Sequence, residues 1–350
     1  KLMGYRIVKK LPTADEIISA LPLSDAGYLS ITRHRDEIEA ILRGDDDRLL
    51  MIVGPCSAWP DTAVLEYAKR LVELEKEVGH ALKLVMRVYI QKPRTIKGWT
   101  GPVNQPDPLA SPDIAAGALY CRKLMTQVVE MGLPIADEAL FTHNARGFIE
   151  LLSWVAIGAR SSEDQEHRIF ASGIDCPVGI KNPTHGSLKI GVNGVVAAQH
   201  SHYIVLDGNE VETDGNPYAH LVLRGSNDHP NYDVKYIAEV AEIYKKNKVL
   251  NPALVIDVSH DNCMINGAKD HNAQAQIVLD VVNQVSAKPE LKKLLKGFML
   301  ESFIKAGKQN AETANPIDLG GLSITDPCLG WDATEKLLLE LAAKLKPIAY

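Results

Sequence analysis

With 350 residues, of which 46% are hydrophobic and 23% charged, the chain is a globular protein that is longer than a usual domain but within the range of single α/β barrels. It has no apolar run of about 18 residues and no secretion signal, and its five cysteines are scattered, so we expect a reduced, cytoplasmic protein without a membrane partner. The net charge of −6 argues against a nucleic-acid binder, which needs a basic surface.

Residues 1–44 are predicted to form a helical extension ahead of the main domain, residues 45–350. Thr13, with Glu16 three residues later, is a capping-box pattern that begins a short helix, and Pro22 ends it. A second helix is predicted over Asp25–Arg43, and Gly44 is placed to end it.

From residue 45 onward, short apolar runs alternate with amphipathic stretches. Near-continuous apolar runs of this length are typical of parallel strands that are buried on both faces. The predicted strands are Leu49–Val53, Leu82–Val88, Leu133–Ala136, Val155–Ile157, Val178–Ile180, Leu221–Leu223, Leu254–Val258 and Phe298–Leu300. The predicted helices between and after them include Asp61–Val78, Pro112–Met131, Asp233–Lys246, Asn272–Val285 and Asp332–Leu345. This order indicates an α/β fold, a (β/α)8 TIM barrel, although periodicity alone leaves a doubly wound open sheet as the alternative.

One connection breaks the alternation. His202–Leu206 and Val211–Thr213 have the pattern of two strands, joined by a turn that contains Asp207 and Gly208. The sequence therefore predicts a β-hairpin over about residues 202–216, inserted before the sixth barrel strand.

Polar side chains stand at or just after the predicted strand ends. In a (β/α)8 barrel these positions meet at the C-terminal face, where active sites lie. In chain order they are Cys56, Arg87, Lys92, Arg94, Thr95, Glu138, Arg160, Lys181, Arg224, His260 and Glu301, with Asp326 in the segment after the last strand. Residues far apart in the sequence are therefore predicted to meet at one mouth.

These side chains form two chemical groups. A thiolate, an imidazole and carboxylates from Cys56, His260, Glu301 and Asp326 suit a first-row divalent ion, for which Mn²⁺ or Fe²⁺ is preferred and Co²⁺ or Zn²⁺ remains open. The six Arg and Lys side chains imply a substrate with several negative charges, because guanidinium and ammonium groups bind carboxylate and phosphate.

Each of these residues taken alone has a structural explanation. A single strand-end arginine is more often a surface ion-pair partner, and Cys56 alone is more often a small core residue. The other four cysteines are predicted to be structural: Cys121, Cys176, Cys263 and Cys328. It is the joint placement at strand ends that favours a functional site.

With these residues in place, the sequence resembles the 3-deoxy-7-phosphoheptulonate (DAHP) synthases, in particular the microbial, feedback-regulated class. The resemblance covers roughly residues 45–345 and rests on short strings in the same order. They are GPCS at Gly54–Ser57, MRVY at Met86–Tyr89, KPRT at Lys92–Thr95, GW at Gly98–Trp99, AIGAR at Ala156–Arg160, CPVG and IKN within Cys176–Asn182, LRG at Leu223–Gly225, DVSH at Asp257–His260, ES at Glu301–Ser302, and SITD and CLGW within Ser323–Trp331.

The resemblance implies a transferase that condenses phosphoenolpyruvate with erythrose 4-phosphate, the first step of the shikimate pathway. It implies that the metal ligands are Cys56, His260, Glu301 and Asp326. Phosphoenolpyruvate would be held by Arg87, Lys92, Arg160, Lys181 and Arg224, with Arg160 and Arg224 on its phosphate. Arg94 and Thr95 would contact the aldose phosphate, and Lys92, Glu138 and His260 would serve in catalysis. The family forms dimers and tetramers, so residues 1–44 are expected to make a subunit contact.

The chain departs from the family pattern near the aldose end of the predicted site. Gln91 stands where Glu is usual, Thr100 where Lys is usual, and His185 where Asp is usual. Two alternatives therefore stay open: a paralogous synthase that takes another phosphorylated aldose, and a non-catalytic regulatory barrel. The hairpin region, which helps to form the family's inhibitor site, is shorter, and Asp175 replaces a small residue; we expect altered or absent inhibition by Phe or Tyr.

Overall fold

The computed structural model describes residues 3–141 and 146–346, and its centre is a closed barrel of eight parallel strands. Around the barrel the strands follow the order β1-β12-β9-β8-β5-β4-β3-β2. Their bounds are β1 Leu49–Gly54, β2 Leu82–Arg87, β3 Ile135–Glu138, β4 Trp154–Ile157, β5 Val178–Lys181, β8 His220–Leu223, β9 Leu254–Asp257 and β12 Leu295–Glu301. This closure confirms the predicted (β/α)8 barrel and excludes the open sheet.

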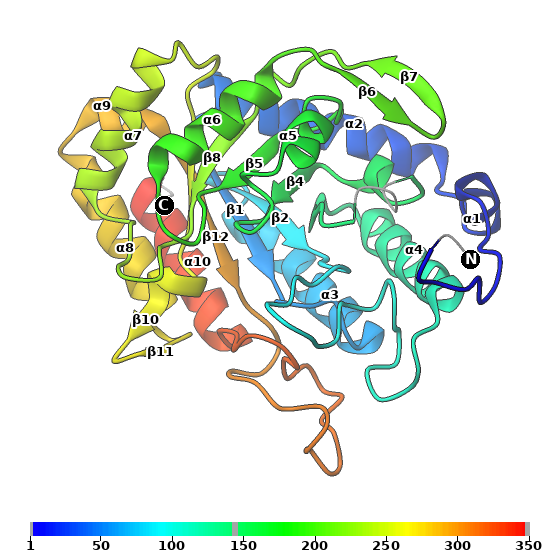
Figure 1. Cartoon of the computed structure of the whole chain (residues 1–350). Coiled ribbons are helices and arrows are strands. Elements are labelled where there is room, and N and C mark those ends of the chain that lie inside the picture. Colours follow the sequence, from blue (N-terminus) through cyan, green and yellow to red (C-terminus); the bar gives the residue numbers. More distant parts are fainter. Residues whose placement is uncertain (1–2, 142–145, 347–350) are drawn as a thin grey trace.

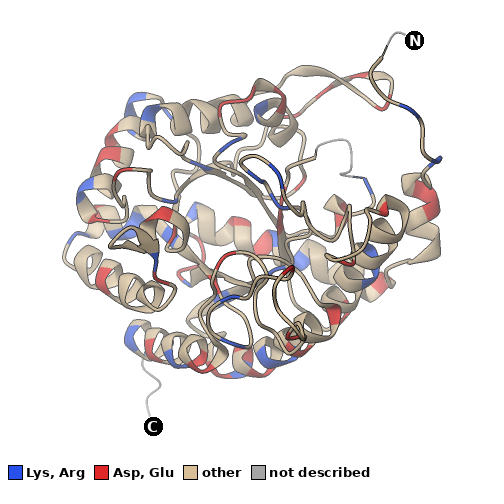
Figure 2. Cartoon of the chain, turned by 60° about the horizontal axis from the view of Figure 1, so that its bottom comes forward, with Lys and Arg blue, Asp and Glu red and all other residues tan. Residues whose placement is uncertain are grey.

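Helices surround the barrel (Figure 1). They are α3 Asp61–Val78, α4 Ile114–Glu130, α5 Gln165–Ala171, α6 Leu188–Gln199, α7 Val234–Lys246, α8 Ala273–Ser286, α9 Pro289–Leu294 and α10 Trp331–Leu345. Lys and Arg alternate with Asp and Glu over these outer helices (Figure 2). Among the described residues, no helix combines the length and apolar character that crossing a membrane requires.

The predicted third strand is displaced by two residues. The apolar run Leu133–Ala136 begins in the turn before the strand, whereas β3 pairs with β2 from Ile135 onward. The strand then continues through Asp137 and Glu138, because both side chains are buried and find polar neighbours: Glu138 in the barrel mouth and Asp137 in the loop after β2. Asp137 Oδ1 accepts the backbone N–H of Ile90 at 3.2 Å.

The two N-terminal helices begin and end as predicted. Helix α1 spans Ala14–Ala20, and the Thr13 side chain accepts the backbone N–H of Glu16. Helix α2 spans Asp25–Arg43 and ends at Gly44, whose φ of 89° is a left-handed conformation that glycine adopts freely.

Helix α2 covers the end of the barrel opposite the long loops (Figure 1). Its side chains Ile38, Ile41 and Leu42 are fully buried and pack with Leu50 of β1 and other residues that fill the barrel interior. Burial of these apolar side chains stabilises the contact between the extension and the barrel.

The predicted hairpin is present, and it precedes the sixth barrel strand. Strands β6 (Tyr203–Leu206) and β7 (Asn209–Glu212) pair antiparallel between α6 and β8, so they leave the barrel on the side of α2 (Figure 1). Asp207 and Gly208 turn the chain with φ of 50° and 75°. The site therefore lies at the other end of the barrel from this insertion.

Candidate active site

A cavity of about 420 Å³ opens at the carboxyl ends of the barrel strands. Its lining includes the predicted site residues Cys56, Arg87, Lys92, Arg94, Thr95, Glu138, Arg160, Lys181, Arg224, His260 and Asp326. Glu301 is not part of the lining surface, but its carboxylate lies against Cys56 and Asp326. The structure thus brings all the predicted positions to one mouth.

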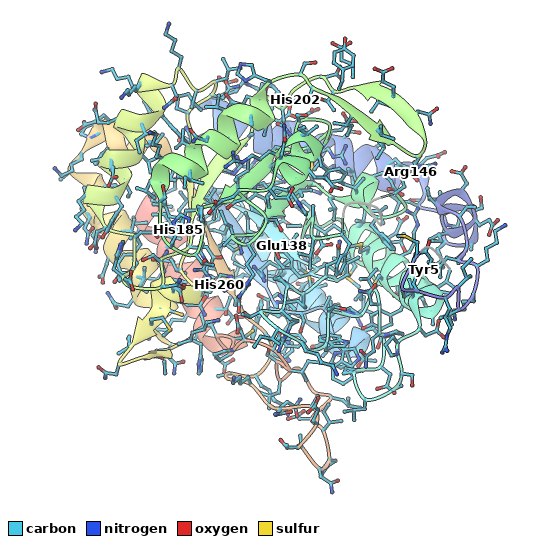
Figure 3. All side chains as sticks on the ribbon, viewed as in Figure 1. Tyr5, Glu138, Arg146, His185, His202 and His260 are labelled. Carbon is cyan, nitrogen blue, oxygen red and sulfur yellow. The ribbon has the colours of Figure 1, made fainter. Side chains whose placement is uncertain are left out.

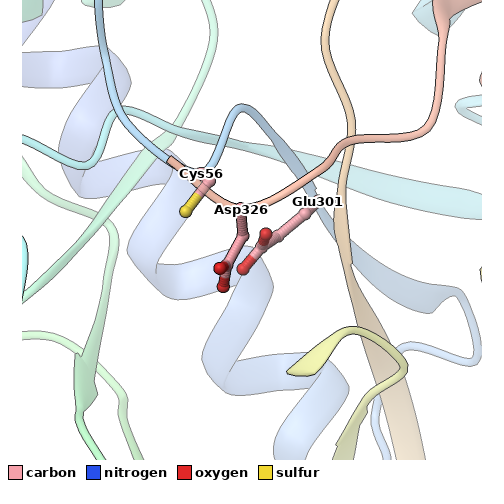
Figure 4. Close-up of side chains that lie close together, drawn as sticks. All are labelled: Cys56, Glu301 and Asp326. Carbon is pink, nitrogen blue, oxygen red and sulfur yellow. The ribbon is translucent and has the colours of Figure 1, made fainter. Parts of the chain in front are cut away.

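At one side of the cavity a thiol and two carboxylates converge (Figure 4). One ligand atom each from Cys56, Glu301 and Asp326 lie within 4.8 Å of one another. The three residues come from the loop after β1, the end of β12 and the long segment between β12 and α10. This spacing allows one ion to contact all three.

His260 joins this group from the loop after β9. Its Nε2 lies 3.3 Å from Glu301 Oε1, and its Nδ1 lies 3.5 Å from Asp326 Oδ2. The backbone of His260 has a φ of 52°, which is uncommon for a residue with a side chain and turns the imidazole into the mouth. Figure 3 shows His260 and Glu138 near the centre of the molecule.

One buried carboxylate oxygen of this group, Glu301 Oε1, accepts no hydrogen bond from the described residues. A buried acceptor without a donor is unfavourable, and a bound cation removes that cost. The mixed thiol, imidazole and carboxylate set is also one that first-row divalent ions accept. The residues therefore fit a bound divalent metal.

The electrostatics of the individual ligands differ. Burial, together with the charge of Glu301, raises the pKa of the Cys56 thiol. Burial opposes ionisation of Asp326, yet its contacts with His260 and Lys269 hold the pKa of this carboxyl far below its usual value. Lys269 Nζ donates to Asp326 Oδ2 at 2.7 Å.

Arg87 is the most deeply buried cation of the site. Its Nε donates to Pro55 O at 3.2 Å, its Nη1 contacts Met299 Sδ at 3.0 Å, and its guanidinium lies 3.7 Å from the ring centroid of Tyr89. Its Nη2 is buried and has no hydrogen-bond partner among the described residues; the nearest charge is Glu301 Oε1 at 3.9 Å. An anion in the cavity would supply the missing acceptor.

Two lysines complete the inner part of the cavity. Lys92 Nζ donates to Cys56 O at 2.5 Å, and although burial opposes its charge, the neighbouring Cys56 and Glu301 raise its pKa. Lys181 Nζ lies 3.2 Å from Asp257 Oδ2 and 3.7 Å from Glu138 Oε1. Burial opposes ionisation of Asp257, but the charges of His260 and Lys181 hold its pKa well below the usual value.

Glu138 is held in the mouth by close packing. A Cβ placed on Gly158 would lie 2.9 Å from Glu138 Oε1, so a larger residue there would shift this carboxylate. Asp137, one residue earlier, faces the opposite side of β3, where it accepts from the backbone N–H of Ile90 and from Gln91 Nε2, and burial raises its pKa to about 8.

The outer cations lie closer to solvent. Arg160 Nη2 donates to Thr95 Oγ1 at 3.1 Å, which joins the loop after β4 to the loop after β2. Arg94 also lines the cavity here. Arg224, at the end of β8, forms an ion pair with Asp261. Next to the mouth, His185 Nε2 contacts Glu163 Oε1 at 2.7 Å.

Four site residues escaped the sequence reasoning: Tyr89, Asp257, Asp261 and Lys269. Asp257 stands in the DVSH string within a predicted strand, and nothing in the sequence marks it as the ion-pair partner of Lys181. Lys269 lies in the short hairpin of β10 (Met264–Ile265) and β11 (Ala268–Lys269), which was not predicted. Nothing in the local pattern around residue 269 shows that its ammonium group reaches Asp326.

Comparisons with known proteins show the family of the chain. A family model described as the DAHP synthetase I family matches residues 28–339. The phospho-2-dehydro-3-deoxyheptonate aldolase of Corynebacterium glutamicum is 38% identical over 348 residues, which cover 96% of this chain and 92% of the relative. The Trp-sensitive enzyme of that name from Escherichia coli K12 is 39% identical over 341 residues, covering 96% and 95%.

A solved structure agrees as well. The phospho-2-dehydro-3-deoxyheptonate aldolase from Francisella tularensis superposes with a TM-score of 0.92 at 34% identity, covering 98% of this chain and 99% of that one. Both the near-complete sequence matches and the shared barrel lead to the same assignment. The chain belongs to the DAHP synthetase I family.

Proposed function

We propose that the chain condenses phosphoenolpyruvate with erythrose 4-phosphate to give 3-deoxy-D-arabino-heptulosonate 7-phosphate and inorganic phosphate, the first step of the shikimate pathway. The observation that carries this proposal is a cavity in which the thiol of Cys56 and the carboxylates of Glu301 and Asp326, with His260 beside the carboxylates, lie next to several buried cations. Family membership supports the same reaction.

The cations that line the cavity suit the carboxylate and phosphate of phosphoenolpyruvate. We assign its binding to Arg87, Lys92, Lys181, Arg160 and Arg224, with Arg160 and Arg224 on the phosphate. The orphaned Nη2 of Arg87 supports this role, because a charged donor without an acceptor in a buried site is ready for an anion. Fixed cations in a site that excludes water also favour the negative charge that develops on the departing phosphate.

Members of this family generally depend on a metal ion. We propose Cys56, His260, Glu301 and Asp326 as its ligands, with Mn²⁺ or Fe²⁺ as the preferred ion and Co²⁺ or Zn²⁺ as alternatives. When bound, the ion supplies Lewis-acid chemistry toward the aldehyde oxygen of the aldose. The ligand side chains fix its position beside the phosphoenolpyruvate site.

The remaining chemistry needs positioned proton donors and acceptors. The enol carbon of phosphoenolpyruvate bonds to the aldehyde carbon, the aldehyde oxygen becomes a hydroxyl, and water adds to the carbon that bears the phosphate, which leaves with cleavage of its carbon–oxygen bond. Lys92, Glu138 and His260 are the candidate groups, since all three line the cavity. We assign Glu138 and His260 to orienting the water or relaying protons, and Lys92 to stabilising negative charge.

The aldose end is assigned to Arg94 and Thr95, which lie at the outer rim. A paralogous acceptor specificity remains the second candidate, because His185 and Glu163 pair beside this rim where the family usually carries another residue at position 185. A changed charge at this position would change the preference for the aldose.

A panel of phosphorylated aldehydes, with release of inorganic phosphate as the readout, tests the function. We expect erythrose 4-phosphate to be the best acceptor in the presence of Mn²⁺. If it is the poorest acceptor of the panel, the chain is a paralogous synthase. If no aldehyde is turned over with any of several divalent metals, the chain is a non-catalytic barrel.

We also propose that the protein is a homodimer or homotetramer and that residues 1–44 contribute to the contact. Tyr5, Ile7 and Val8 are largely exposed at the N-terminal side, as are Tyr203 and Val205 of the hairpin. Exposed apolar side chains in such numbers favour a protein interface. Light scattering of the full chain and of a chain that lacks residues 1–12 tests this contact. The cytoplasmic location of the protein stays a prediction.

A further inference from the structure

Arg224 is already paired with a carboxylate that is not part of the cavity wall. Its Nη1 donates to Asp261 Oδ2, and the two side chains are 9% and 18% exposed. Within residues 3–141 and 146–346, Asp261 is the one polar partner of the Arg224 side chain. Arg224 lines the cavity, whereas Asp261 is not among the lining residues.

The fold holds Asp261 in this place. Asp261 lies in the 3-10 helix His260–Cys263, and a Cβ on Gly225 would lie 2.8 Å from Asp261 Cβ, so the two segments touch. The neighbouring Asn262 donates through Nδ2 to Asp257 O at 2.8 Å and to Leu223 O at 3.3 Å. These contacts fix the carboxylate beside the guanidinium and leave it little freedom to swing away.

The other cavity cations have different partners. Arg160 contacts the neutral hydroxyl of Thr95, and the carboxylates near Arg87 and Lys181 belong to the group around the metal ligands. A bound metal would compete for those carboxylates. Asp261 forms its ion pair with Arg224 and with none of the proposed metal ligands, so it would stay on Arg224 when the site is loaded.

We propose that Asp261 sets the affinity of the cavity for phosphate groups by sharing the positive charge of Arg224. This inference rests on the proposed function, because it takes Arg224 as a ligand of the substrate phosphate. A phosphate that reaches the Arg224 guanidinium from the cavity meets a positive charge that the Asp261 carboxylate already partly neutralises. Asp261 therefore weakens binding of phosphoenolpyruvate and speeds release of inorganic phosphate, and it acts as a positioning residue through Arg224.

The variant Asp261→Asn isolates the charge, since its amide oxygen still accepts the hydrogen bond from Arg224. Binding of inorganic phosphate to the Mn²⁺-loaded full chain is measured by calorimetry at low salt. We expect about tenfold tighter binding, which equals about 1.4 kcal/mol. The gain should shrink as salt is added, because it is electrostatic. In turnover, KM for phosphoenolpyruvate should fall while KM for erythrose 4-phosphate stays constant.

Two further variants control the comparison. Asp228→Asn removes an exposed carboxylate from the loop that follows Arg224 and is expected to change phosphate affinity less than twofold. Arg224→Gln is expected to weaken phosphate binding and to abolish the effect of Asp261→Asn in the double variant. If Asp261→Asn does not fold, Asp261→Ser removes the same charge and gives the same comparison.

The outcomes separate cleanly. If Asp261→Asn binds phosphate no more tightly than Asp228→Asn, or binds it more weakly than the parent, Asp261 only orients Arg224 and the inference is wrong. If Arg224→Gln leaves phosphate binding unchanged, Arg224 is no phosphate ligand and the inference falls. In both cases the aldehyde panel still decides the proposed function, because turnover of erythrose 4-phosphate does not depend on this result.

Discussion

Replacing Arg87 by Met should separate binding from stability. Arg87 is fully buried, and its Nη2 has no hydrogen-bond partner in the described structure. A buried charge with incomplete pairing is unfavourable for folding, so its removal recovers desolvation energy. The same removal takes away the group that would bind the acidic end of phosphoenolpyruvate.

The magnitudes follow from the contacts. The stacking of Arg87 over Tyr89 and its hydrogen bond to Pro55 O contribute about 1 kcal/mol each. The recovered desolvation offsets them, so the free energy of unfolding of the metal-loaded protein should change by less than about 1 kcal/mol. Two charge-assisted hydrogen bonds to the substrate are worth about 1.5–3 kcal/mol each. Losing both weakens phosphoenolpyruvate binding by about a hundred- to ten-thousandfold.

Arg122 of helix α4 is the matched control. It is equally buried, and its Nη2 also lacks a partner within the described residues, but the rest of its guanidinium donates to Leu21 O at 2.9 Å, to Gly147 O at 2.7 Å and to the carboxylate of Glu150. Arg122→Met leaves these acceptors unpaired and should lower the free energy of unfolding by about 3–5 kcal/mol. Its affinity for phosphoenolpyruvate should not change.

Urea unfolding and calorimetric binding of phosphoenolpyruvate, both with saturating Mn²⁺, give the two quantities for each variant. The metal must be present in both experiments, because Arg87→Met removes the guanidinium that lies 3.9 Å from Glu301. Without the metal, the buried Glu301 carboxylate would then lack a compensating cation. The reasoning is refuted if Arg87→Met is destabilised as much as Arg122→Met while binding of phosphoenolpyruvate is retained.

Further outcomes follow from the rim, the buried histidines and the hairpin. Arg94→Ala should raise KM for the aldose at least tenfold more than KM for phosphoenolpyruvate, and steady-state kinetics that show equal effects would contradict its assignment to the aldose. Burial lowers the pKa of both His34 and His220 to about 4, from 6.5 when unfolded. Between these two pKa values the unfolded chain binds protons that the folded chain excludes, so the free energy of unfolding is highest above pH 6.5 and should fall by up to roughly 3 kcal/mol per histidine as the pH drops toward 4. Urea unfolding at several pH values measures this loss. If His34→Gln and His220→Gln leave the loss unchanged, other groups cause it. Inhibition by Phe or Tyr should be weak or absent, and strong inhibition by micromolar Phe in a steady-state assay would reject that expectation.

Much of the architecture was predictable because burial leaves a direct trace in the sequence. Strands that are covered on both faces need near-continuous apolar residues, and β1 and β5 begin where those runs begin. The cap at Thr13 and the left-handed Gly44 follow from local chemistry alone. The position of β3 was wrong because Asp137 and Glu138 are polar strand residues, which only the tertiary pairing reveals.

The site was predictable only in part for the same reason. Strand ends fix where Cys56, His260 and Glu301 emerge, so their meeting follows from the topology. The approach of Asp326 depends on the irregular segment between β12 and α10, which has no periodicity to interpret. The pairs Arg224–Asp261 and Lys269–Asp326 are contacts between side-chain ends, and no spacing rule encodes them.

The central claim is that one divalent ion lies between Cys56 and Glu301 beside a cation-lined pocket. Anomalous diffraction from crystals soaked with Mn²⁺ and phosphoenolpyruvate tests it directly. We expect a single strong peak in the mouth, within about 2.0–2.6 Å of Cys56 Sγ and of oxygens of Glu301 and Asp326, with the phosphoenolpyruvate anion against Arg87. A peak that contacts neither Cys56 nor Glu301 contradicts the account.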